Sequence, residues 1–148
     1  MMPSYDAGMT VGIDGEAEFK KSLGAINSTL KALGSELKAV TAEFQDNADS
    51  MEALTAKADV LRRSISENEK RLDIVTAKYQ EQQTAVNDLA AELQKITQEY
   101  GANSKEAAQA QRAYDAAYKE LQYFADQANR TRTNLGNLRS QLSKVESQ

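Results

Sequence analysis

Apolar residues recur along most of the chain at intervals that alternate between four and three positions. The pattern begins at Phe19 and, counted in heptads with Leu23 at position a, keeps one phase to Val145. A spacing that averages three and a half residues places these side chains on one narrow strip of an α-helix and is typical of coiled coils. We call this strip of a and d positions the seam. Its predicted members are Leu23, Ile26, Leu30, Leu33, Leu37, Val40, Phe44, Leu54, Leu61, Ile65, Leu72, Val75, Val86, Leu89, Leu93, Ile96, Leu121, Phe124, Leu135, Leu138 and Leu142.

Two readings of the seam are open. A strict heptad strip predicts a left-handed supercoil between helices, so that separate copies of the chain associate along it. The same strip could instead be the buried face of helices in a globular bundle. Helices in bundles usually carry a broader apolar stripe, and the narrow strip therefore favours the coiled coil.

Two polar breaks divide the seam into three predicted helices, over about 16–45, 50–100 and 104–147. The breaks lie near 46–49 and 101–103, where Asp, Asn and Gly favour turns. The heptad phase survives both breaks, which favours an elongated rod, whereas the breaks themselves allow the chain to fold back. Between these alternatives we favour a helical hairpin of the second and third helices, with Gly101 at the C′ position.

Residues 1–15 lack the heptad pattern and are rich in Gly. We expect a flexible or short extended segment here, before a coiled-coil region over 16–148. The heptads are still running at Gln148, and we therefore expect the chain to be a fragment of a longer protein.

A few polar residues occupy seam positions. A buried Asn at such a position can fix register and oligomeric state while lowering stability. Asn68 lies in the middle of a predicted helix and is the candidate for this role. Asn47, Gln82 and Thr131 also fall on d positions, with Asn47 expected in a loop.

The composition excludes most chemistry. The chain has no Cys and no His, which removes thiolate nucleophiles, His bases and Cys/His zinc sites. The net charge is −4, both signs are interspersed, and no basic block could neutralise phosphates. We therefore expect a protein that is not an enzyme, with no catalytic, cofactor-binding or metal site, no small-molecule ligand and no nucleic-acid partner.

The segment from Val11 to Lys20, VGIDGEAEFK, resembles the N-terminus of tail tape measure proteins from siphophages and prophages of Gram-positive bacteria. The sequence MEALTAK at 51–57 and the break YGANS at 100–104 are similar to that family as well. The resemblance covers roughly residues 11–140. Members of the family are usually much longer, with hydrophobic segments that are missing here.

The resemblance implies a structural protein inside the phage tail tube whose helical length sets the length of the tail. It implies self-association, as a trimer or hexamer, and assembly with tail tube and tail assembly chaperone proteins. The expected location is the host cytoplasm during assembly and the lumen of the virion tail afterwards. The alternative is a soluble coiled-coil adaptor or regulatory binding module unrelated to tails.

Overall fold

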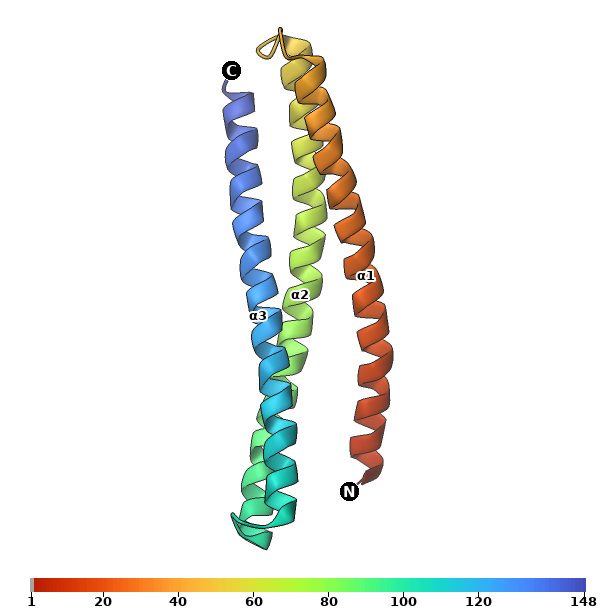
Figure 1. Cartoon of the computed structure of the whole chain (residues 1–148), viewed down its shortest axis with the longest axis vertical. Coiled ribbons are helices and arrows are strands. Elements are labelled where there is room, and N and C mark those ends of the chain that lie inside the picture. Colours follow the sequence, from red (N-terminus) through yellow and green to blue (C-terminus); the bar gives the residue numbers. More distant parts are fainter. Residues whose placement is uncertain (1) are drawn as a thin grey trace. The chain divides into compact units, whose positions relative to one another are not determined.

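The computed structural model describes the backbone of residues 2–148 and the side chains of residues 17–148. Over this part of the chain it contains three helices and no strand: α1 (Met2–Glu43), α2 (Met51–Tyr100) and α3 (Lys105–Glu146), shown in Figure 1. The all-α prediction is confirmed, and the helices end and restart within one or two residues of the predicted breaks. Good helix formers such as Ala, Leu, Glu, Lys and Gln dominate these segments.

The start of α1 differs from the prediction. We expected a helix from residue 16 after a flexible or short extended segment, whereas residues 2–15 belong to α1. Pro3 lies in the first turn, where its missing N–H has no helical partner in any case. Each Gly in this segment lowers helix propensity by about 1 kcal/mol relative to Ala but does not forbid the helix. The side chains of these residues lie outside the described part.

Serine side chains begin both later helices. The Ser50 Oγ accepts a hydrogen bond from the Ala53 N–H at 3.1 Å, and the Ser104 Oγ accepts one from the Ala107 N–H at 3.0 Å. These are N-cap contacts, each of which pairs one of the N–H groups left without a partner in the first turn. The two caps therefore fix where α2 and α3 begin.

Gly101 ends α2 in the conformation that the sequence suggested. Its φ is +94°, a left-handed value that glycine adopts without steric cost, and its N–H donates to the Thr97 carbonyl at 2.9 Å. The hydroxyl of Ser104 donates to the Gly101 carbonyl at 2.7 Å. The short break between α2 and α3 is thus held by contacts within itself.

The chain divides into two compact units. The first unit comprises Met1–Ile74 and Thr133–Gln148, and the second unit comprises Val75–Arg132. The first unit contains α1, the beginning of α2 and the end of α3. The second unit contains the remainder of α2 and α3 with the break between them.

Polar contacts join the helices of the first unit. The Arg63 Nη2 lies 2.6 Å from the Glu36 Oε2, which links α2 to α1. The Arg139 Nη2 lies 3.0 Å from the Glu69 Oε2, which links α3 to α2. α2 therefore contacts a helix on two of its sides in this unit.

Apolar side chains form the interior of each unit. Burying a side chain of the size of Val, Leu or Phe contributes roughly 1.5–3 kcal/mol, more than an exposed ion pair does. In the first unit the buried apolar residues are Phe19, Leu23, Ile26, Leu33, Ala53, Ala58, Val60, Leu61 and Leu135. In the second unit they are Val75, Val86, Ala107, Leu121, Phe124 and Ala128.

Glycine substitutions test the helix boundaries. Gly101→Ala should lower the free energy of unfolding by about 1–2 kcal/mol, because its left-handed backbone disfavours any Cβ. Gly24→Ala and Gly34→Ala should raise it by up to about 1 kcal/mol each, because both lie within α1. At all three positions an added Cβ meets no atom within 4 Å, so only backbone preference differs. Urea unfolding followed by circular dichroism measures the changes, and a common sign at all three positions would contradict these boundaries.

Candidate functional site

The structure places no residue of the predicted seam in the exposed class. The residues that are fully buried are Leu23, Ile26, Leu33, Leu61, Val75, Val86, Leu121, Phe124 and Leu135. Those that are half-buried are Leu30, Leu37, Val40, Phe44, Leu54, Ile65, Leu72, Leu89, Leu93, Ile96, Leu138 and Leu142. The heptad count therefore identified a covered face on all three helices.

This burial arises within one chain. Because the structure describes a single chain, the atoms that cover the seam belong to the chain's own helices. The burial is thus what a bundle of helices would also give. The predicted use of the same face for association between copies stays a prediction.

In the first unit α2 buries a wider face than the seam. Ala53 and Val60 at position c and Ser64 at position g are buried as well, although the heptad count did not include them. The reason is that α2 contacts α1 through Arg63 and α3 through Arg62. A helix with neighbours on two sides needs a broader apolar stripe. The one signal in the sequence is Val60, an apolar residue directly beside a seam leucine.

Asn68 lies in this wider face and is 3% exposed. Its Nδ2 donates to the Ser64 carbonyl, one turn earlier on α2, at 3.0 Å. Its Oδ1 is buried and has no hydrogen-bond partner among the described residues. A buried acceptor without a partner costs roughly 1–3 kcal/mol, and Asn68 is thus placed where a residue that fixes register would be.

The other polar residues at d positions have partners or face solvent. The Thr131 hydroxyl donates to the Gln127 carbonyl at 2.8 Å within α3. The Gln82 Nε2 donates to the Ala117 carbonyl at 2.9 Å, which links α2 and α3 in the second unit. Asn47 is exposed in the break between α1 and α2, as expected. Among these residues, the unpaired acceptor distinguishes Asn68.

Arg63 is the centre of a small surface network. Its guanidinium contacts Glu36 across the helices and Asp59 one turn earlier on α2, the latter at 2.8 Å. These hydrogen bonds raise the pKa of Arg63 above its ordinary value, Glu36 contributing first and Asp59 second. Stability from a raised pKa is present below that pKa and is lost only at very alkaline pH, so Arg63 stays charged near neutrality.

The aromatic residues of α3 are only partly covered. The rings of Tyr114 and Tyr118 stack with centroids 6.1 Å apart, and the rings of Tyr123 and Phe124 meet edge to face at 5.6 Å. Phe124 is buried, whereas Tyr118 and Tyr123 are 43% and 52% exposed. The group thus contributes to the interior of the second unit mainly through Phe124.

The described residues show no arrangement suited to metal chemistry or to a membrane. No group of three acidic, His or Cys side chains in residues 17–148 could hold a metal ion. In the same part of the chain, every helix is too polar or too short in its apolar stretches to cross a bilayer. A groove is present at the end of α1, lined by Leu37, Lys38, Thr41, Ala42 and Gln45.

Comparison with known proteins adds no relative: no protein-family model, no curated protein and no solved structure matches the chain.

Replacing Asn68 by Leu tests whether its acceptor is truly unpaired. Asn68→Leu should raise the free energy of unfolding by about 1–3 kcal/mol, because an unpaired acceptor is replaced by an apolar group of similar size. Asn134→Leu, on an exposed position of α3, serves as the control and should change it by less than about 0.5 kcal/mol. Both are measured by urea unfolding. A destabilised Asn68→Leu beside a neutral control would mean that the acceptor has a partner.

Proposed function

We propose that the chain is a structural helical scaffold without enzymatic activity, and that it acts through the length and packing of its helices. The observation that carries the proposal is the covered seam: from Leu23 to Leu142 every predicted seam residue is buried or half-buried. Nearly the whole described chain is devoted to pairing helices. The carboxylates lie on solvated faces and in ion pairs rather than in a cluster suited to catalysis.

The polar contacts support antiparallel packing of coiled-coil type within the first unit. As residue number rises from Asn27 to Glu36 on α1, the partner on α2 falls from Arg71 to Arg63. Opposed numbering of this kind is expected of helices that run in opposite directions. A hairpin joined by a short loop would produce it.

The α2–α3 contacts support the same interpretation. As residue number rises from Arg62 to Glu69 on α2, the partner on α3 falls from Glu146 to Arg139. Each pair is seven residues from the next on both helices, one heptad, which is the spacing expected when flanking positions of a coiled coil exchange ion pairs. We therefore infer hairpins at both breaks rather than a straight rod.

The particular scaffold that we propose is a tail tape measure protein of a siphophage or prophage. The support is the resemblance of the segment from Val11 to Lys20 to that family, together with an all-helical chain. In this role the chain works in the host cytoplasm during assembly and then in the lumen of the tail. Its partners are further copies of itself, as a trimer or hexamer, the tail tube protein and the tail assembly chaperones.

Helix geometry relates this role to residue number. An α-helix rises 1.5 Å per residue, so a ruler built from helices changes length in proportion to the residues removed. The proportion depends on folding back, because two antiparallel helices contribute the length of only one. Length per residue therefore distinguishes a ruler made of hairpins from a straight one.

Paired heptad deletions test the proposed ruler. Gln82 and Ala117 are in contact, so residues 82–88 and 111–117 are facing heptads whose joint removal preserves the seam phase. In the virus that encodes the chain, this deletion should shorten tails by about 10 Å if the heptads are antiparallel, and by about 21 Å if the chain is extended. Electron microscopy of negatively stained tails averages enough particles to measure such a difference.

The control restores the two heptads with copies of 61–67 and 132–138, which should return the tails to their original length. Unchanged tail length in the deletion variant would contradict the ruler and leave the adaptor as the better proposal.

Seam charges test the proposed self-association. Leu30→Asp with Leu37→Asp introduces charges on the covered face of α1, and should reduce both helicity and the mass of the assembly. Lys31→Asp with Lys38→Asp introduces the same residue on exposed neighbours and should change neither. Light scattering combined with circular dichroism measures both quantities. A monomeric parent chain, or equal effects of the two double variants, would count against association through the seam.

A further inference from the structure

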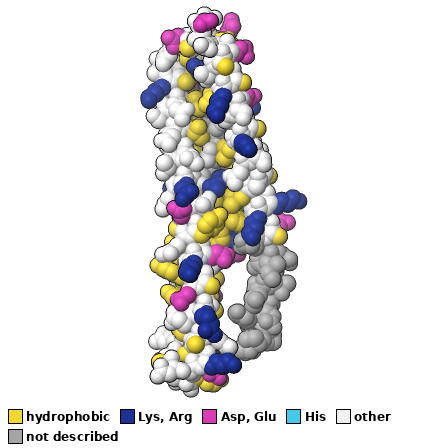
Figure 2. All heavy atoms as spheres, in the orientation of Figure 1, with side chains coloured by type: hydrophobic (Ala, Val, Ile, Leu, Met, Phe, Trp, Pro, Cys, Tyr) yellow, Lys and Arg dark blue, Asp and Glu magenta, His cyan; other side chains and the backbone are white. Residues whose placement is uncertain are grey.

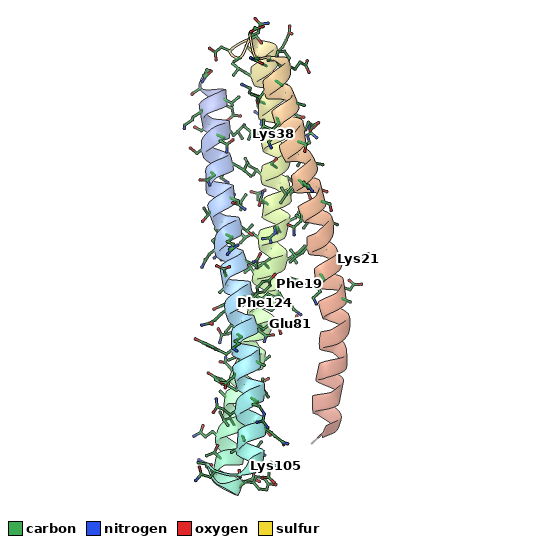
Figure 3. The ribbon with its side chains drawn as sticks, in the orientation of Figure 1. Phe19, Lys21, Lys38, Glu81, Lys105 and Phe124 are labelled. Carbon is green, nitrogen blue, oxygen red and sulfur yellow. The ribbon has the colours of Figure 1, made fainter. Side chains whose placement is uncertain are left out.

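The groove at the end of α1 lies outside the packing described so far. It has a volume of about 390 Å³ and is lined by Leu37, Lys38, Thr41, Ala42 and Gln45. Leu37 is half-buried, whereas Thr41 and Ala42 are exposed, so that the floor consists of small and apolar groups. Lys38, labelled in Figure 3, lies on its edge. The groove belongs entirely to the first unit.

The end of α3 explains why the groove is open. Glu146, the last residue of α3, pairs with Arg62 of α2, and the neighbouring Arg63 pairs with Glu36 of α1. The residues of α1 after Glu36 and those of α2 before Arg62 therefore extend past α3. A third helix covers this side of the first unit only up to that level.

Apolar side chains beyond this level are incompletely covered. Leu37, Val40, Phe44 and Leu54 are all half-buried, and Met51 is 78% exposed. Each of these residues is at an a or d position, where a neighbouring helix would bury it. The open stretch thus offers the face that the seam uses elsewhere.

The charge around the open stretch is uniformly negative. Glu43, Asp46, Asp49 and Glu52 are exposed, and residues 39–56 contain no Lys or Arg. None of the four carboxylates is in an ion pair within the described residues. Figure 2 shows acidic side chains gathered where Figure 1 places the break between α1 and α2. The C-terminal end of α1 adds the negative end of its dipole here.

We propose that this groove docks a basic amphipathic helix of a partner protein. Apolar residues spaced at i, i+3 or i+4 and i+7 enter the groove, as helices do in other hydrophobic grooves, and flanking Lys or Arg residues face the four carboxylates. A second copy of the chain is disfavoured as the occupant, because a symmetric contact at this end would oppose two sets of carboxylates. The proposal is independent of the role in tails.

Two synthetic peptides test the charge requirement. Each has about 18 residues, enough for five helical turns, with Leu at the groove-facing positions. One carries Lys and the other Glu at the flanking positions. Fluorescence anisotropy with the full chain should show binding of the Lys peptide alone, weakened about tenfold when salt is raised from about 50 to about 500 mM.

Substitutions in the chain test the groove itself. Ala42→Glu fills the groove without removing a carboxylate and should weaken binding of the Lys peptide at least about tenfold. Ala39→Glu is the matched control: Ala39 is an exposed residue of α1 outside the groove lining, and its change should leave binding within about twofold. A combined Glu43→Gln, Asp46→Asn, Asp49→Asn and Glu52→Gln variant should bind about tenfold more weakly and lose the salt dependence.

Three outcomes would overturn the proposal. Equal affinity for the two peptides would remove the charge requirement. Unchanged binding to Ala42→Glu, with weakened binding to the neutralised variant, would mean that the peptide meets the acidic residues without entering the groove. Sedimentation that shows a dimer of the chain, dissociated by Ala42→Glu but not by Ala39→Glu, would identify a second copy as the occupant.

Discussion

Each helix of this chain carries one apolar strip and must find another helix to cover it. The strip is the only extended apolar surface that the sequence supplies, because the outer positions are filled by Ala, Ser and charged residues. Ion pairs such as Glu36–Arg63 lie at the edges and are about half exposed, so they orient helices more than they stabilise them. Burial of side chains such as Leu61 and Phe124, both nearly inaccessible to solvent, therefore dominates the free energy of folding.

The position of α2 between two neighbours changes what its strip must contain. A wider face brings Val60 and Ser64 inside, and it also brings Asn68 inside with one acceptor unpaired. An apolar residue at position 68 would pack with helices in more than one register. The Asn is tolerated because the surrounding leucines and valines offset its cost, and a polar group that is satisfied only in particular alignments restricts how the helices slide.

The sequence specified the helices more completely than their neighbours. Heptad phase and the turn residues at Ser50, Gly101 and Ser104 located the two breaks, because caps and a left-handed Gly act through local geometry. The start of α1 was not predictable in this way, since Gly and Pro3 weaken a helix without forbidding it. The burial of Val60 was missed because periodicity along one helix reports a face, not the number of helices against it. The groove was missed for the same reason.

The covered seam constrains how this chain could assemble with others. Leu23, Leu61 and Leu135 are already buried by the chain's own helices, so copies could pair through these residues only if helices first separate and exchange partners. Exchange of that kind costs the burial of one interface before it gains another. The open stretch beyond Glu146 carries no such cost, because Leu37 and Met51 are already accessible. A partner with a complementary helix would therefore bind at the open stretch before any rearrangement of the seam, and assembly along the seam would follow as the slower step.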